Sequence, residues 1–367
     1  LIALMMTGMP LGVVTLIVSI ICALLFFGPR GLYLVSTNAF GLLENYPLVA
    51  VPLFVLMASL LEKAGIAEDL IDAMSIFAGK LRGGVAVQTV IVAVVMAAMS
   101  GIMGGEIVML GLVALPQMLR LGYDRKLSIG TICASGSLAT LIPPSIVMIV
   151  YGLSAQVSIG DLFMAGAIPG LMLALFYIVF VLIRCAINPS LAPTAEEAAA
   201  RKGEQATLSS NRLAAVGLSI LLIACVMGSI YAGIASVTEA AGGGDFMRSL
   251  FSGLDLPPLG IIFVMMAVLM VLGTFMEWIA ILFITVPIFA PVVVGMAPEL
   301  GLEPEWAAVW FGVLFVMNIQ IYFLSPPFGP ACFWLKSVAP KDVTLQEIFV
   351  AVLPFIGLQI IGLMMVL

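Results

Sequence analysis

Long apolar runs separated by short polar stretches dominate the chain and predict helices that cross a lipid bilayer. About 20 apolar residues are enough to cross the ~30 Å hydrocarbon core. The predicted simple crossings, which contain no charged residue, are Pro10–Phe27, Pro47–Leu61, Leu162–Ile183, Leu213–Ala232 and Phe349–Leu367. Residues 67–81 differ, because their apolar positions gather on one face and their charged positions avoid it. That pattern predicts a helix lying on the membrane surface.

Two shorter apolar runs, Gly84–Met99 and Ile107–Leu119, are joined by residues 100–106, which include three glycines and Glu106. Lysine and arginine stand at both outer ends of this pair, so the positive-inside rule places both ends on the cytoplasmic face. Either a re-entrant hairpin or two full crossings satisfies that rule. The glycine-rich joint with its carboxylate favours the hairpin.

A second pair of short apolar runs, Leu259–Leu272 and Ile279–Val294, is joined by residues 273–278. Acidic residues dominate its flanks, and Arg248 is the only base nearby. By the same rule this hairpin opens to the outer face. The two predicted hairpins therefore point in opposite directions.

Each hairpin is followed by a crossing run that contains adjacent prolines. Pro143-Pro144 interrupts Leu127–Ala155, and Pro326-Pro327 interrupts Trp306–Leu335. Proline lacks an amide donor and clashes with the preceding turn, so both helices should break. Unpaired backbone at such depth is tolerated only where it is buried in protein or lines a polar cavity.

The same order of features occurs twice along the chain. Glu106 lies ten residues before Pro116, Glu277 lies ten residues before Pro287, and a double-proline break follows each. The pattern predicts an all-α polytopic membrane protein with an inverted-topology repeat, two re-entrant helical hairpins and two interrupted helices. Such repeats are typical of secondary transporters that bind substrate and coupling ions near the bilayer midplane.

Broken helices offer binding groups for ions. Their carbonyl ends can hold Na⁺, and their amide ends attract a substrate carboxylate. Short polar side chains near the breaks are candidate ligands: Ser100, Ser135, Ser137, Thr140, Ser145, Thr274, Asn318 and Ser325. Alternatively, each hydroxyl satisfies the backbone of its own helix.

Glu106 and Glu277 are candidate ion-coupling carboxylates, because a carboxylate within a spanning segment is costly, at least ~2.5 kcal/mol on insertion scales. The alternative is a capping role, since an acid is favourable at a helix N-terminus. Exchanging either residue for glutamine and measuring uptake distinguishes the two roles.

Composition excludes several classes of function. Apolar residues make up 63% of the chain and charged residues 9%, which excludes a water-soluble enzyme. Without histidine the chain builds no Ser-His-Asp triad and no imidazole metal site. The 14 basic residues are too few and too dispersed for a nucleic-acid groove. The cysteines are expected to be small buried hydrophobic residues without disulfides: Cys22, Cys133, Cys185, Cys225 and Cys332.

Several segments in linked order resemble one known family. They include SGIMGGEIVMLGLVALPQMLRLGYD, LIPPSIVMIVYGL, TEAA, GTFMEWIAILFITVPIFAPVV and SPPFGPACFWLKSVAP. The chain resembles the large membrane subunit of tripartite ATP-independent periplasmic (TRAP) transporters, which are related in architecture to divalent-anion/Na⁺ symporters. The resemblance implies an elevator-type, Na⁺-coupled importer of organic acids, not an enzyme, in a bacterial or archaeal inner membrane. It also implies a small four-helix membrane subunit and a periplasmic substrate-binding protein as partners, besides the lipid bilayer.

The resemblance also implies site residues. For the substrate these are Ser100, Gly101, Gly104, Gly105, Ser145, Gly273, Thr274 and Ser325. For Na⁺, with two or more ions expected, they are Ser100, Gly104, Ser135, Gly136, Ser137, Thr140, Pro143, Gly273, Thr274, Glu277, Asn318, Ser325 and Pro326.

An elevator divides the chain into moving and fixed parts. The moving transport domain would comprise residues 84–157 and 259–338, each a hairpin with its broken helix. The fixed scaffold would comprise residues 1–83 with the surface arm, 158–258 with a cytoplasmic connector at 185–212, and 339–367.

The chain departs from the family pattern at three places. The first tip reads S-G-I-M where the family usually has S-G-S-S, and residues 318–327 lack the acid of the usual N-L-E-I-G-L-L-T-P-P. Between Thr238 and Leu259 the family normally has two further helices, whereas this chain has a short Gly-rich join.

The main alternative function is a channel built on re-entrant loops. The identity of the transported organic acid stays open.

Overall fold

The computed structural model describes residues 11–43, 82–101, 103–193, 257–273, 278–326 and 329–367. Most of these residues are helical, and none of them forms a β-strand. Contacts divide the chain into two compact units, Leu1–Pro52 and Leu53–Leu367, which are described separately.

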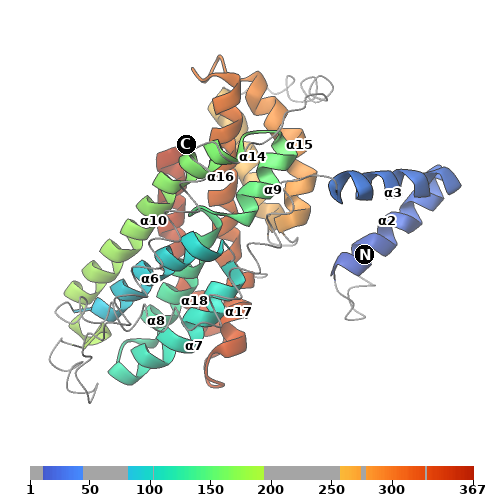
Figure 1. Ribbon diagram of the computed structural model, residues 1–367. Coiled ribbons are helices and arrows are strands. Elements are labelled where there is room, and N and C mark those ends of the chain that lie inside the picture. Colours follow the sequence, from blue (N-terminus) through green and yellow to red (C-terminus); the bar gives the residue numbers. More distant parts are fainter. Residues whose placement is uncertain (1–10, 44–81, 102, 194–256, 274–277, 327–328) are drawn as a thin grey trace, which may run out of the picture. The chain divides into compact units, whose positions relative to one another are not determined.

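The first unit contains two packed helices, α2 (Leu11–Phe27) and α3 (Pro29–Leu43) (Figure 1). α2 confirms the predicted run at this place. Gly28 makes the turn with a φ of 62°, a conformation that glycine adopts without strain. α3 was not predicted, because its serine, threonine and asparagine residues obscure the apolar pattern.

In the second unit, α6 (Gly84–Ser100) and α7 (Met103–Leu121) form the first helical hairpin. The sequence placed the start of the second leg at Ile107, with a loop before it. α7 begins four residues earlier, so Gly104, Gly105 and Glu106 are helical. The joint at the tip is therefore much shorter than predicted.

The second hairpin consists of α14 (Pro258–Gly273) and α15 (Trp278–Gly295). Both helices begin and end close to the bounds predicted for the two legs. Residues 274–277, which include Thr274 and Glu277, lie outside the described part of the chain.

Both helices with paired prolines are broken, as predicted. The first runs as α8 (Arg125–Ser137), continues as the 3₁₀ turn η2 (Leu138–Thr140), and resumes as α9 (Ile146–Ala155). The second runs as α16 (Pro304–Leu324) and resumes as α17 (Pro330–Val338).

Each broken helix is followed by a long helix with the same local design. The hydroxyl of Ser158 caps α10 (Ile159–Ile187) by accepting from the Asp161 amide at 3.3 Å. The hydroxyl of Thr344 caps α18 (Leu345–Val366) by accepting from the Glu347 amide at 3.1 Å. Both helices also contain an internal proline, and α10 is followed by the short turn η3 (Pro189–Leu191).

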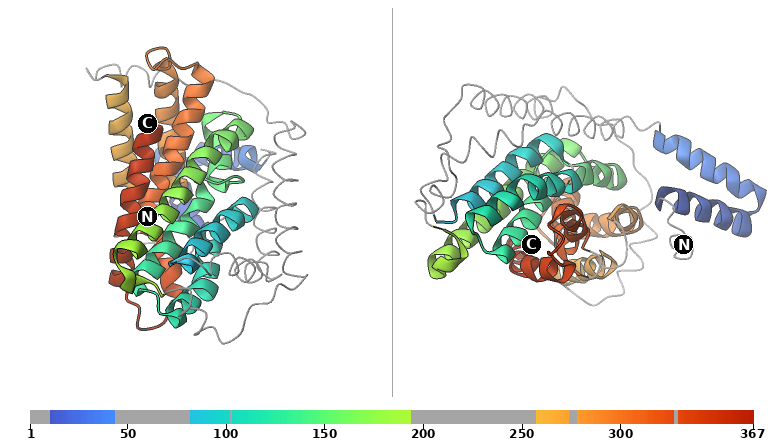
Figure 2. Two further views of the ribbon diagram at one scale, coloured as in Figure 1. Left: turned by 90° about the vertical axis from the view of Figure 1, so that its left-hand side faces the viewer. Right: turned by 90° about the horizontal axis from the view of Figure 1, so that it is seen from below.

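Charge separates the two ends of the second unit. Every lysine and arginine described in this unit lies at one end, called the basic end: Arg82, Arg120, Arg125, Lys126, Arg184, Lys336 and Lys341. The opposite, acidic end carries Asp161, Glu299, Glu303 and Glu305. Figures 1 and 2 show the α7–α8 turn and the α17–α18 loop at one end, and the α15–α16 turn at the other.

Contacts between segments far apart in sequence hold the basic end together. The guanidinium of Arg125 pairs with Asp342, and its Nε lies 3.5 Å from a carboxylate oxygen of Glu347. The Tyr123 hydroxyl accepts a 3.1 Å hydrogen bond from the amide of Val85. The starts of α6, α8 and α18 therefore lie at the same end.

Four described helices are long and apolar enough to cross a membrane: α7, α10, α16 and α18. α16 is central, because 94% of its apolar window is buried against other parts of the protein. The chain is a multi-pass membrane protein.

Some predictions concern residues outside the described segments: Pro47–Leu61, the surface arm at 67–81, the connector beyond residue 193, and Leu213–Ala232. Among the cysteines, Cys133, Cys185 and Cys332 are buried as expected. Cys22 is exposed, which corrects its prediction, and Cys225 lies outside the described residues.

Candidate functional site

The tip of the first hairpin lies on the break of the first interrupted helix. Gly101 ends α6 with a φ of 63°, and a Cβ placed on it would lie 2.3 Å from the carbonyl oxygen of Pro144. Only glycine permits this backbone-to-backbone contact. The sequence-predicted residues Gly101, Pro143 and Ser145 are thus brought to one place.

A buried carboxylate stands beside this contact. Glu106, in the first turn of α7, is 1% exposed and accepts a hydrogen bond from the Ser100 hydroxyl through Oε1. Its other oxygen, Oε2, has no hydrogen-bond partner among the described residues. The position in the first turn fits a capping role, whereas the unpaired oxygen leaves a strong acceptor for a cation or proton.

Side-chain hydroxyls replace the amides that the prolines cannot supply. The Ser145 hydroxyl donates to the carbonyl oxygen of Thr140 at 2.5 Å, where the nitrogen of Pro144 has no hydrogen to offer. The same hydroxyl oxygen accepts from the Met148 amide at 3.3 Å and caps α9. The break is therefore an ordered feature rather than a frayed end.

The end of α8 packs closely on the start of α7. A Cβ on Gly136 would lie 2.4 Å from the side chain of Ile107, next in sequence to Glu106. Ser135 is fully buried, and its hydroxyl has no partner among the described residues. The Ser137 and Thr140 hydroxyls donate to backbone carbonyls three residues earlier. These two bonds fit the alternative prediction, in which each hydroxyl satisfies the backbone of its own helix.

The second predicted site is described in part. A Cβ on Gly273 would lie 2.5 Å from the ring of Tyr322, which brings the end of α14 against the end of α16. Asn318 donates to the carbonyl oxygen of Met266 at 3.0 Å, and its Oδ1 has no described partner. Ser325 bonds back to Ile321 at 2.7 Å. Pro326 follows and is exposed.

Aromatic rings connect the two hairpins. A Cβ on Gly104 would lie 3.2 Å from the indole of Trp334. The Trp334 ring lies 6.1 Å from that of Phe323, which stacks on Tyr322 at 4.7 Å. Tyr322 in turn contacts Gly273. The tip of the first hairpin is thus linked to the end of α14.

Two buried glutamines were missed at this site. Gln320 of α16 and Gln359 of α18 both donate to Ser137 at 3.1 Å, the first to its carbonyl oxygen and the second to its hydroxyl. A signal was present in the sequence, because an amide side chain is unusual within a spanning run. The sequence alone, however, did not indicate that Ser137 is the partner of both glutamines.

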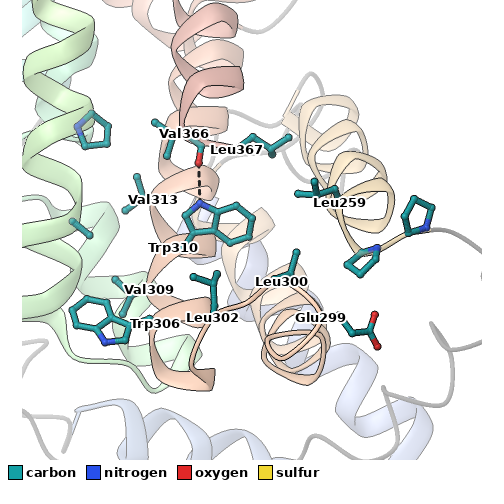
Figure 3. A pocket seen from close by; sticks show the side chains of 14 residues that line it. Leu259, Glu299, Leu300, Leu302, Trp306, Val309, Trp310, Val313, Val366 and Leu367 are labelled. Atoms are coloured by element: carbon teal, nitrogen blue, oxygen red, sulfur yellow. Dashed lines mark hydrogen bonds between the residues drawn. The ribbon is translucent and has the colours of Figure 1, made fainter.

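A cavity that Figure 3 shows in close-up lies elsewhere, at the acidic end. Its volume is about 750 Å³, and its lining includes Trp306, Trp310, Leu259 and Glu299. None of the sequence-predicted site residues lines it.

Comparison with known proteins gives the family. The family model described as the tripartite ATP-independent periplasmic transporter, DctM component, matches residues 1–251 and 242–367. The chain belongs to the DctM family. The resemblance predicted from its motifs is confirmed.

Three DctM relatives show how far the similarity extends. The C4-dicarboxylate TRAP transporter large permease protein DctM of Pseudomonas aeruginosa is 29% identical over 399 residues, covering 94% of this chain and 89% of the relative. The ectoine TRAP transporter large permease protein TeaC of Halomonas elongata is 27% identical, covering 98% and 93%. The sialic acid TRAP transporter large permease protein SiaM of Vibrio cholerae is 26% identical, covering 96% and 91%.

The alignment to the Pseudomonas DctM protein spans 399 positions, more than the 367 residues of this chain. The relative therefore has residues without a counterpart here. The two matches to the DctM family overlap at residues 242–251, within the Gly-rich join where the resemblance expects two further helices.

Proposed function

We propose that this chain is the permease of a Na⁺-coupled secondary importer that carries an organic acid across the bacterial inner membrane by an elevator-like mechanism. Membership of the DctM family supports transport. The observation that carries the finer proposal is the contact of Gly101 with Pro144, because it joins a hairpin tip to a helix break inside the protein.

The arrangement of helix ends supports an inverted repeat. α6 and α7 have their open ends at the basic end, whereas α14 and α15 have theirs at the acidic end. Ser137 and Gln320 each stand six residues before the first proline of a pair, and they are hydrogen-bonded to each other. A direct bond between equivalent positions is what a two-fold axis through the centre would produce.

Charge supports the orientation. Cytoplasmic ends of membrane helices carry an excess of lysine and arginine. The basic end is therefore assigned to the cytoplasm and the acidic end to the periplasm, where a substrate-binding protein would deliver the acid. A small membrane subunit completes the proposed assembly.

Unpaired buried oxygens near the first hairpin tip and along the two broken helices support cation binding. Ser135, Glu106 and Asn318 each have a buried oxygen without a described partner, and oxygen atoms are the groups that transporters use to hold Na⁺. Bound Na⁺ would supply positive charge beside the substrate carboxylate. The first ion would be held by the tip of the first hairpin and the α8 break, and the second by the tip of the second hairpin and the α16 break.

The packing of α18 bears on which helices move. The predicted division places residues 158–258 and 339–367 in the fixed scaffold. However, a Cβ on Gly130 of α8 would lie 2.3 Å from the carbonyl oxygen of Ala351 of α18, and Gln359 is bonded to the end of α8. We therefore assign α18, together with α10 that packs on it, to the moving part.

Reconstituted uptake tests the proposed function. The purified permease, with its small subunit and binding protein, is placed in liposomes, and uptake of a labelled C4-dicarboxylate, sialic acid or ectoine is measured. Uptake that needs an inward Na⁺ gradient and shows counterflow is expected. Flux that shows no counterflow and does not saturate would instead indicate a channel.

A further inference from the structure

Two glutamines from the second half of the chain hold one residue of the first half. The Nε2 group of Gln320 donates to the Ser137 carbonyl, and that of Gln359 donates to the Ser137 hydroxyl, each at 3.1 Å. Gln320 and Ser137 are 0% exposed and Gln359 is 1% exposed. These hydrogen bonds are therefore shielded from bulk solvent, and losing one leaves a buried polar group unsatisfied.

Both the carbonyl oxygen and the hydroxyl oxygen of Ser137 need a hydrogen-bond donor from another helix. The Ser137 hydroxyl gives its proton to the carbonyl oxygen of Ala134 at 2.7 Å, so its oxygen can only accept from Gln359. The Ser137 carbonyl also accepts from the Thr140 hydroxyl at 2.9 Å. An apolar side chain at position 320 removes the donor to the Ser137 carbonyl, and one at position 359 removes the donor to the Ser137 hydroxyl.

Ser137 is where α8 ends. The chain then turns through η2 and reaches Pro144, whose carbonyl contacts Gly101. The position of Ser137 consequently sets where the break meets the tip of the first hairpin.

We propose that Gln320 and Gln359 are positioning residues that fix the end of α8, and thereby transmit the arrangement of α16 and α18 to the predicted ion site at the first break. Their role is to hold Ser137 in place, not to bind substrate. The role in transport rests on the proposed function, whereas the role in holding the break does not.

Hydrogen–deuterium exchange tests the structural part. In Gln320→Met and in Gln359→Met, the amides of residues 138–149 are expected to exchange about threefold faster, the factor expected for an average interhelical hydrogen bond in a membrane protein. Methionine keeps the length of the side chain and removes the donor. Gln88→Met is the matched control, because Gln88 is a buried glutamine near the start of α6. Unchanged exchange at the break in both variants would overturn the proposal.

The Na⁺ concentration for half-maximal uptake tests the functional part. A rise of roughly threefold to tenfold is expected in both variants but not in Gln88→Met. A residue needed only for folding would lower the amount of active protein and leave this concentration unchanged, and that outcome would overturn the positioning role. In a Ser137→Ala background, Gln359→Met should cause no further loss, because the hydroxyl that accepts from Gln359 is already absent.

If the unaltered protein shows no Na⁺-dependent uptake, the proposed function fails. The exchange measurement then decides alone whether the glutamines hold the break. The two failures are therefore distinguishable.

Discussion

The backbone of Gly101 lies against the carbonyl oxygen of Pro144, so the tip of one hairpin and the break of one helix occupy a single place in the fold. Proline opens the helix there, and glycine lets the tip approach. Pro144 lacks an amide hydrogen and Gly101 lacks a side chain. Because the contact depends on both absences, neither residue can be exchanged without moving the other.

Gly101→Ala is expected to destabilise the protein by roughly 2–4 kcal/mol, from the steric clash with Pro144 and the left-handed backbone together. Uptake should fall at least tenfold. Gly301→Ala is the matched control, because Gly301 has a φ of 69° and open space around its Cβ position. Unfolding in detergent and uptake in liposomes measure both effects, and equal losses in the two variants would contradict the contact.

Glu106→Gln separates an ion-coupling carboxylate from a capping residue. The amide oxygen still accepts from Ser100, so the protein should fold, while the Na⁺ concentration for half-maximal uptake should rise tenfold or more. Asp161→Asn removes an acid from the first turn of α10 and serves as the control. If both variants behave alike, Glu106 acts only through the helix terminus.

The ion pair at the basic end makes stability depend on pH. The hydrogen bond that Asp342 accepts from Arg125 lowers the pKa of this carboxyl group below its ordinary value of 3.8. The pair therefore stabilises the folded state above that value, and its contribution disappears as the pH falls through the lower folded-state pKa. Asp342→Asn should lower the unfolding temperature slightly at pH 7 and not at all at the acidic limit.

Glu303→Gln is the control for that measurement, because Glu303 is exposed at the opposite end and has no ion pair among the described residues. Its unfolding temperature relative to the unaltered protein should not follow the same pH dependence. High salt should reduce the effect of Asp342→Asn, since the pair is exposed.

Gly130→Ala tests the close contact of α8 with α18. The added methyl group would lie 2.3 Å from the Ala351 carbonyl oxygen, so the helices must separate, at a cost of about 1–3 kcal/mol. Gly357→Ala, on the open side of α18, should be neutral or slightly stabilising. A neutral Gly130→Ala in detergent unfolding would show that α18 does not pack on α8 in this way.

Local chemistry decides which features the sequence could predict. Pro143-Pro144 and Pro326-Pro327 break their helices wherever the rest of the chain lies, so both breaks were predicted. The early start of α7 was missed, because Gly104 and Gly105 are poor helix formers that are nevertheless helical here, the first of them packed against the ring of Trp334.

Long-range pairing decides what the sequence could not predict. α18 reads as a plain crossing, and nothing near Gln359 indicates a partner 222 residues earlier. Likewise, the spacing from Glu106 to Pro116 identifies a repeated unit but not the bond to Ser100. Such partners become apparent only when the helices are placed in space.

The burial of α16 constrains how the protein is made. The groups that accept from Asn318 and Gln320 belong to Met266 and Ser137, which both precede α16 in the chain and are synthesised before it. Biogenesis of α16 should therefore depend on α8 and α14 being already in the membrane when it arrives. A change that delays either helix would leave the amides of α16 facing hydrocarbon, and α16 should then be the segment that attracts quality control.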